Sequence, residues 1–398
     1  MTVNNCHEVR MLHRVPEVTA DDGTVLGALD EIRRDLRHAL ARPRRWEGTL
    51  RRQARARAVR GSNSIEGIRV SGDEAFAIVG GEEDQVSVDE TWLAVKGYSD
   101  AMTYLQIVAE RSGPPLDEST LLAVHFLMQG HDLLRRPGRY RDREVFVRDE
   151  DAERTVYAGP DPQAVPALMT EYIDHLDELA ARDLHPMIQG AMAHLNLVMI
   201  HPFADGNGRL SRIMQSLMLY REQVAEAEFV SIEEYLGRNT AAYYEVLARV
   251  GGGRFSPERD AGEWVEFALT AHYRQARTIQ RRIWLSDRVA EMVDELIEQA
   301  EAPSRAASAL ELAFSGWGLR NATYRDLADV SAGTASRELG ALVEAGVLQR
   351  HGAKKGSSYS PSDQHFEAIL GLREDADAAF DVAVDPYRLV RRREVIPV

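Results

Sequence analysis

Apolar residues recur every three or four positions through most of the first two thirds of the chain, and this period constrains the fold more than any other feature. The clearest segments are "GTVLGALDEIRRDLRHAL", "VDETWLAVKGYSDAMTYLQIVAER" and "PMIQGAMAHLNLVMI". One stretch departs from the helical period: "REVFVRD" and "RTVYAGP" are rich in β-branched and aromatic residues and flank the polar "EDAE". The sequence therefore predicts a mainly α protein with one β-hairpin at residues 143–159.

Composition limits the class of protein. The 398 residues are 44% apolar, enough for the cores of two or three domains, and no run of eighteen uncharged apolar residues is present. Cys6 is the only cysteine, so an intrachain disulfide is excluded. We therefore expect a soluble, cytoplasmic protein with no membrane partner.

Charge is distributed unevenly along the chain. The formal net charge of −15 disfavours general attraction to nucleic acid, yet arginines are concentrated between Arg33 and Arg60. An exposed arginine-rich helix explains this concentration. A contact with nucleic acid or with an acidic partner is the alternative.

In the stretch "HPFADGNGRLSR", residues 201–212, residues 201–208 connect two segments of helical period. Its Gly-Asn-Gly, residues 206–208, falls at the beginning of the second helix. Unpaired backbone N–H groups and the helix dipole attract anions there, and glycine lets a phosphate approach the backbone. The connection therefore predicts an anion site.

The polar side chains of this stretch suit phosphate chemistry. Arg209 and Arg212 are three positions apart in the first helical turn, so both can reach one polyphosphate. Asp205 offers a hard oxygen ligand for Mg²⁺, and His201 titrates near neutrality and can accept a proton from a hydroxyl. The set favours phosphoryl or nucleotidyl transfer.

Simpler explanations exist for each member taken alone. Gly-Asn-Gly can be only a turn, Asp205 a helix cap and Arg212 a solvated surface residue. A zinc site is also conceivable from His194 and His201, but no further ligand completes a known spacing. The coincidence of all members favours the phosphate site.

The stretch resembles the Fic signature, His-Pro-Phe-x-Asp/Glu-Gly-Asn-Gly-Arg-x-x-Arg, at every fixed position. "RRPGRYRDREVFV" with "RTVYAGPDPQAVPALMTEYIDHL" resembles the flap hairpin of that family and the segment after it, and "NTAAYYEVLA" resembles its nucleoside-side helix. The resemblance covers roughly residues 45 to 280. It implies a helical core that transfers AMP from ATP to a hydroxyl of a target protein.

The resemblance also implies roles for individual residues. His201 would be the catalytic base, Asp205 would hold Mg²⁺, and the hairpin would dock the target protein as an added strand. The ATP and phosphate contacts would come from Gly206, Asn207, Gly208, Arg209, Leu210, Ser211, Arg212 and Tyr243.

A second motif, "SNSIEG" at residues 62–67, is similar to the inhibitory pattern that some Fic proteins carry before the core. It comprises Ser62 and Glu66, and in those relatives the glutamate pairs with the second arginine of the signature, here Arg212. Such a pair occupies the arginine that would bind phosphate, and it puts negative charge where a γ-phosphate must lie. A capping pair at a helix end is the simpler explanation.

One position departs from the family pattern. Relatives often carry a polar residue eight positions after the first tyrosine of the "YY" pair, and counted from Tyr243 that position is Gly251. Tyr243 and Tyr244 could border the base of the nucleotide, or they could be core tyrosines. Selectivity for adenine is therefore less certain than phosphate binding.

The C-terminal part resembles a winged helix-turn-helix domain. "NATYRDLADVSAGTASRELGALVEAGVLQR" predicts a helix, a tight turn at residues 331–333 and a second helix from Thr334 to Ala345. "VLQRHGAKKGSSYS" predicts two short strands around a basic loop. The basic residues that could contact DNA phosphates are Arg337, Arg350, Lys354 and Lys355. A protein contact is the alternative.

These segments divide the chain into three predicted regions. A helical region with the inhibitory motif takes residues 1–110, the Fic core 111–280, and a helical linker with the winged helix 281–398. The predicted function is an ATP-dependent protein adenylyltransferase that is inhibited by its own Glu66 and can also modify itself. The alternatives are a DNA-binding regulator that senses nucleotide, or a Fic enzyme that removes AMP or transfers another phosphate-containing group. A second copy of the chain is a further candidate partner.

Overall fold

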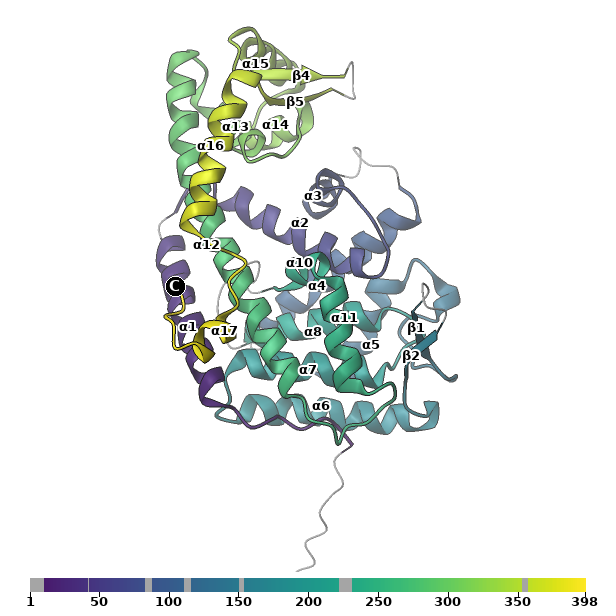
Figure 1. Cartoon of the computed structure of the whole chain (residues 1–398). Helices are drawn as coiled ribbons and strands as arrows, with labels where there is room; N and C mark the ends of the chain where they lie inside the picture. Colours follow the sequence, from purple (N-terminus) through teal and green to yellow (C-terminus); the bar gives the residue numbers. More distant parts are fainter. Residues whose placement is uncertain are drawn as a thin grey trace, which may run out of the picture.

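The computed structural model describes residues 11–41, 43–82, 88–110, 116–149, 154–221, 231–352 and 357–398 (Figure 1). Within these ranges most residues are helical, as the apolar period predicts. The helices are α1 (Ala20–Leu40), α2 (Glu47–Ile65), α3 (Gly72–Gly80), α4 (Glu90–Glu110), α5 (Glu118–Gln129), α6 (Val165–Ala181), α7 (Pro186–Ile200), α8 (Asn207–Arg221), α10 (Glu233–Arg238), α11 (Thr240–Gly251), α12 (Gly262–Gln299), α13 (Ala307–Phe314), α14 (Asn321–Ala328), α15 (Ala332–Glu344), α16 (Asp363–Ala379) and α17 (Pro386–Arg391). No helix in the described ranges is both long and apolar enough to span a bilayer.

Helices α7 and α8 form the centre of the main core. Helix α7 is apolar on all sides, and thirteen of its fifteen residues, beginning with Met187, are buried. A helix of this kind must be covered all round. It packs against α6, α8 and α12, while α4 lies against α8, so the two helices that flank the α7–α8 connection are covered by other helices (Figure 1).

The predicted β-hairpin is present. Strands β1 (Phe146–Asp149) and β2 (Arg154–Ala158) pair antiparallel, with Phe146 opposite Ala158 and an irregularity after Val147. The polar turn at 150–153 lies outside the described residues. Ala158 also bonds to the segment after α11, because its N–H donates to Gly253 O at 3.0 Å.

One helix of 38 residues, α12, runs from the main core to a second cluster of buried residues. It runs without a break through residue 280, so the predicted boundary between the second and third regions lies inside a helix. The chain later returns along α12 as α16, and α17 packs on α1 (Figure 1). There the hydroxyl of Tyr387 donates to Asp22 Oδ1 at 2.5 Å, which ties the C-terminal segment to the N-terminal helix.

The second cluster contains α13, α14, α15 and a three-stranded antiparallel sheet in the order β3-β5-β4. Its strands are β3 (Leu319–Arg320), β4 (Leu348–His351) and β5 (Ser358–Pro361). Helix α15 begins two residues earlier than expected, because Ser331 caps it by accepting the Thr334 N–H at 3.3 Å. Lys354 and Lys355 lie outside the described residues, as does Cys6.

Several arginines between Arg33 and Arg60 are bonded inside the protein, which differs from an exposed arginine face. Arg33 is buried. Arg52 contacts Phe76 O at 2.9 Å and Glu82 at 2.5 Å, and Arg45 pairs with Glu311 of α13 at 2.6 Å. These arginines connect α2 and the segment before it to α3 and to the C-terminal cluster.

Candidate active site

Residues 201–206 connect α7 to α8 in a loop with a fixed shape. His201 ends α7 in the left-handed region with φ of 51°, and α8 begins at Asn207. The Asn207 side chain closes the loop from within, because its Oδ1 accepts the Phe203 N–H at 2.8 Å and its Nδ2 donates to Phe203 O at 2.9 Å. This side chain therefore shapes the loop, and the residue has its backbone N–H left for a ligand.

His125 of α5 holds the same loop from outside. Its Nδ1 accepts the Gly138 N–H at 2.9 Å, so Nε2 carries the hydrogen and donates to Asp205 O at 2.9 Å. The ring stacks on Phe203 with centroids 3.7 Å apart. Burial lowers the pKa of His125 to about 4, so the ring is neutral near pH 7. Sequence reasoning did not select His125, because it lies in an apolar helical segment with no motif.

Arg141 joins the loop to the base of the hairpin. Its guanidinium donates to His201 O at 2.8 Å, Arg143 O at 2.9 Å and Pro160 O at 2.7 Å. These three carbonyls come from both sides of the hairpin and from the end of α7. Arg141 lies in the predicted flap segment, and nothing local in the sequence distinguishes it from the arginines beside it.

His201 has the tautomer of a general base. Its Nδ1 lies 3.1 Å from Val198 O and donates to it, which leaves Nε2 without a hydrogen. Burial is the main cause that lowers the pKa of His201, and its bond to Val198 O and the charge of Glu66 oppose this only in part. The ring is therefore neutral near pH 7 and able to accept a proton.

The beginning of α8 offers unpaired donors. By helix geometry the N–H groups of Asn207, Gly208 and Arg209 have no intrahelical acceptor. The Arg209 side chain is 2% exposed, and its Nε and Nη1 have no partner among the described residues. Buried guanidinium nitrogens without partners are costly, so the site is built for an anion.

Two predicted phosphate contacts face the interior instead. Leu210 is fully buried and its N–H donates to Gly206 O at 3.0 Å. Ser211 is also buried, and its hydroxyl donates to Asn207 O at 2.8 Å. Both residues lie next to the anion site in sequence and pack α8 against the core.

Asp205 points outward beside the unpaired N–H groups at the beginning of α8. Its side chain is 39% exposed, and its Oδ1 accepts the Gly206 N–H at 2.6 Å. Arg209 Nη2 lies 3.8 Å from Oδ1, and Arg135 Nε lies 3.9 Å from Oδ2. A carboxylate with an exposed oxygen can take up an additional cation.

The two predicted halves of the inhibitory contact are brought together by the fold, although 146 residues separate them in sequence. Arg212 Nη2 lies 2.7 Å from Glu66 Oε1, and the same side chain donates to Ser62 Oγ at 2.7 Å and to Ser62 O at 3.0 Å. Burial alone would lower the pKa of Arg212, but the charge of Glu66 outweighs it and the pKa is raised. Glu66 follows the last residue of α2 and acts as its C-cap.

Glycine at position 208 is required for this contact. A Cβ on Gly208 would lie 2.5 Å from Glu66 Oε1 and 3.1 Å from Arg212 Nη1. The carboxylate of Glu66 therefore lies directly against the first turn of α8, where an anion would bind.

Tyr243 is buried beneath the site. It is 1% exposed, and its hydroxyl lies 2.9 Å from His194 Nε2, while His194 Nδ1 lies 2.7 Å from Gln215 Oε1. This network accounts for His194 without a metal. Tyr244 is 42% exposed, and its hydroxyl donates to Ile65 O at 3.2 Å, next to Glu66.

Gly251 ends α11 in a crowded position. A Cβ there would lie 3.1 Å from Met199 Sδ and 3.4 Å from the Tyr157 ring. Packing between α7 and the hairpin therefore explains the small residue at this position.

Comparison with known proteins finds one family that is similar to part of the chain. Residues 115–219 match the model of the Fic/DOC family. The Protein adenylyltransferase Fic of Nematostella vectensis is 28% identical over 200 residues, 49% of this chain and 43% of the relative. The Protein adenylyltransferase Fic of Aedes aegypti is 31% identical over 138 residues, 35% of this chain and 26% of the relative. The chain thus covers less than half the length of either relative.

The fold is shared over most of the chain. A crystal structure of a Fic family protein from Desulfovibrio desulfuricans G20 aligns with a TM-score of 0.55 and 23% identity, and the match covers 88% of this chain and 99% of that one. This likeness concerns the fold, including helices outside residues 115–219. The chain is therefore similar to Fic proteins in sequence over residues 115–219 and in fold over most of its length.

Proposed function

We propose that this protein is a protein adenylyltransferase, which transfers AMP from ATP to a hydroxyl of a target protein and of itself. The observation that carries the proposal is the pair of buried arginines at the beginning of α8, with unpartnered nitrogens on Arg209 Nε and Nη1 and on Arg212 Nη1 within the described ranges. A neutral histidine at the end of α7 adds the base. The names of the relatives support the same activity.

The chemistry follows from these positions. His201 Nε2 takes the proton of the target hydroxyl, whose oxygen forms a bond to the α-phosphorus while the bond to the bridging oxygen of pyrophosphate breaks. The N–H groups of residues 207–209 and the Arg209 guanidinium stabilise the charge that develops on the transferred group. Arg212 holds the γ-phosphate.

Mg²⁺ fits this site as a partner of the phosphates. The described residues contain no group of three or more histidine, cysteine, aspartate or glutamate side chains that could hold a metal by themselves. Asp205 offers one carboxylate on a side chain that is 39% exposed, and Mg²⁺ commonly takes one or two carboxylates with phosphate oxygens and water. Bound there, the ion would neutralise phosphate charge.

Glu66 would restrain this activity. Its carboxylate holds Arg212 at 2.7 Å and lies against Gly208, so ATP must displace it to reach the same arginine and the same helix terminus. Like charges repel, and the γ-phosphate of ATP is negative. We infer that Glu66 makes ATP bind weakly or in an unproductive position.

The hairpin would position the target protein. In the described part of the hairpin β1 pairs only with β2, and Phe146 is 48% exposed. An unpaired strand edge can accept an extended peptide through backbone hydrogen bonds. Arg141 fixes the base of the hairpin to the His201 carbonyl, which sets the distance between peptide and base.

A DNA contact is the second candidate function. Helices α14 and α15 with β4 and β5 have the order of a winged helix-turn-helix domain, and Arg337 is exposed on α15. The domain would then read or hold DNA while the Fic domain senses nucleotide. A gel-shift assay at 50 and 200 mM salt tests this candidate, and Arg337→Ala should weaken any shift.

Intact-mass measurement tests the transfer. Wild type, Glu66→Gly and the double variant Glu66→Gly, His201→Ala are each incubated with ATP and Mg²⁺, and in parallel with CTP or GTP. The Glu66→Gly protein should gain the mass of one AMP for each modified site, and the double variant should gain none. Added mass on the double variant would contradict the catalytic assignment, and a gain from another nucleotide alone would contradict ATP as the donor.

A further inference from the structure

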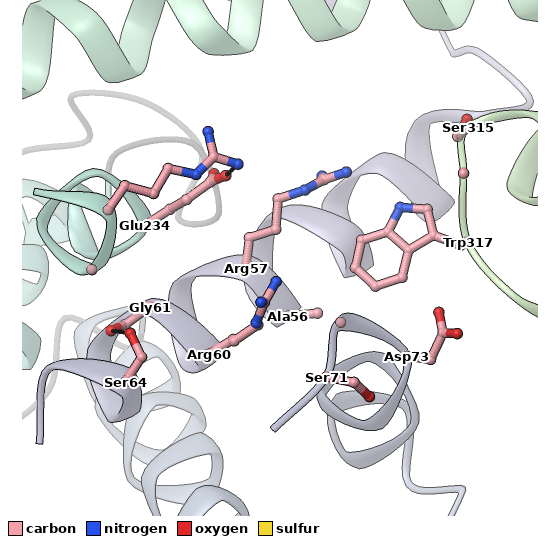
Figure 2. A pocket seen from close by; sticks show the side chains of 14 residues that line it. Ala56, Arg57, Arg60, Gly61, Ser64, Ser71, Asp73, Glu234, Ser315 and Trp317 are labelled. Carbon is pink, nitrogen blue, oxygen red and sulfur yellow. Dashed lines mark hydrogen bonds and ion pairs between the residues drawn. The ribbon is translucent and has the colours of Figure 1, made fainter. Parts of the chain in front are cut away.

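A cavity of about 450 Å³ lies between α2, α3, α10 and the segment that follows α13, apart from the α7–α8 site (Figure 2). Arg57 and Arg60 rise from the same face of α2 into it, with Glu234 on one side and Trp317 and Asp73 on the other (Figure 2). The cavity thus joins the N-terminal helices, the core and the C-terminal cluster.

The charges around the cavity are predominantly positive. Three arginines and two acids line it. Glu234 is already neutralised, because Arg282 binds it at 2.6 and 2.7 Å and Arg238 binds it at 2.7 Å. Burial alone would raise the pKa of Glu234, but the two arginines lower it to about 2. In a chain with a net charge of −15, such a local excess of arginine calls for an anionic partner.

Arg57 has a guanidinium nitrogen that finds no hydrogen-bond partner among the described residues. Its guanidinium lies 4.9 Å from the centre of the Trp317 ring, and its Nη1 is buried with no hydrogen-bond partner among the described residues. Burial, together with the charges of Arg282 and Arg238, lowers the pKa of Arg57 to about 9. An anion in the cavity would supply the missing acceptor and compensate the charge.

The beginning of α3 adds backbone donors. Ser71, Gly72 and Asp73 line the cavity, and Ser71 Oγ accepts the Glu74 N–H at 3.2 Å. The N–H groups of Gly72 and Asp73 have no intrahelical acceptor, and the helix dipole favours an anion there. Asp73 is turned to the C-terminal cluster, where its Oδ1 accepts the Gly318 N–H at 3.1 Å.

We propose that this cavity binds a small phosphate-bearing molecule. Two guanidinium groups and a helix N-terminus supply donors in several directions, which suits the oxygens of a phosphate, and Trp317 provides an apolar wall for the rest of the ligand. The cavity is bounded by four segments of the chain, and its volume is that of sites for small ligands. The ligand is therefore a free phosphate ester and not a phosphorylated protein.

The cavity borders the last turn of α2, the helix that is capped by Glu66. Ser64 lines the cavity, while Ser62, in the same turn of α2, bonds to Arg212 on the opposite side. At this turn α2 and α10 are in backbone contact, since a Cβ on Gly61 would lie 2.5 Å from Glu233 O. A bound ligand should therefore stabilise α2, α3 and α10 together against local unfolding. The binding site itself does not depend on the proposed transfer activity.

Calorimetric titration of the full chain with pyrophosphate as the probe tests the proposal. Arg60→Gln combined with Arg238→Gln changes two exposed side chains, so the variant should fold, and we expect its Kd to be at least tenfold weaker. Arg57→Lys should also weaken binding, because the variant loses the planar guanidinium group that lies over the Trp317 ring. Arg249→Gln, an exposed arginine of α11 that pairs with Glu263, is the matched control and should bind as wild type does.

Hydrogen exchange locates the bound probe. Pyrophosphate should slow exchange in α2 and α3 of wild type and not in the Arg60→Gln, Arg238→Gln variant. Absence of binding to wild type at millimolar probe, or equal affinity in that variant, would overturn the proposal, because binding only at α8 does not involve these arginines. Citrate binding as tight as pyrophosphate binding would overturn the preference for phosphate.

Discussion

Replacing Glu66 by glycine should release Arg212 and raise the rate of AMP incorporation. The contact is a charge-assisted hydrogen bond of 2.7 Å between a side chain that is 1% exposed and one that is 25% exposed. Bonds of this kind contribute about 1.5 to 3 kcal/mol. Because ATP must displace the carboxylate, productive binding of ATP should strengthen by about 10- to 150-fold in the variant.

The same substitution should lower stability when no nucleotide is present. Arg212 keeps its bonds to Ser62 but loses the carboxylate that compensates its buried charge. We expect a loss of about 1 to 3 kcal/mol in the free energy of unfolding, which saturating ATP should largely restore. Glu66 follows the last residue of α2, so glycine at this position does not interrupt the helix.

The assay is the initial rate of label transfer from radiolabelled ATP at concentrations below saturation. Glu301→Gly changes another glutamate just after a helix and is the control for effects of glycine itself. Glu66→Asp keeps the charge on a shorter side chain and should fall between wild type and Glu66→Gly. Equal initial rates for wild type and Glu66→Gly would refute the inhibitory role.

Three further outcomes follow from the structure. Burial lowers the pKa of His201, so the acid limb of kcat/KM for the Glu66→Gly enzyme should lie below pH 6.5, and a limb above that value would contradict a buried base. Burial raises the pKa of Glu233 to about 7 from an ordinary 4.5, so the folded state binds a proton that the unfolded state has lost, and stability declines as the pH rises from 4.5 through 7. Glu233→Gln should therefore be more stable than wild type by at most roughly 3 kcal/mol at pH 8 and nearly equal at pH 4, measured by urea unfolding. Arg141→Ala loses three bonds to carbonyls and should destabilise the fold by about 2 kcal/mol and speed hydrogen exchange in residues 141–160, whereas the exposed Arg143→Ala should do neither.

The sequence predicted the helical class and the hairpin because both depend on local period, and the structure confirms both. It also predicted that residues 201–208 connect two helices, and the structure has the connection at residues 201–206. The predicted boundary between residues 280 and 281 lies inside α12, which is a single helix from Gly262 to Gln299. Local period cannot show whether a long helix belongs to one core or joins two.

The sequence by itself determined which chemical groups lie at the beginning of α8. They are a histidine and an aspartate in the loop before the helix, and glycines and two arginines at the helix start. Only the tertiary structure decided which partners these groups have. His125 and Arg141 act on the loop through carbonyl bonds that leave no pattern in sequence. The Glu66–Arg212 contact and the arginine cavity behind it both require α2 to pack across α8 and α10, and such long-range packing depends on the whole core and not on any local period.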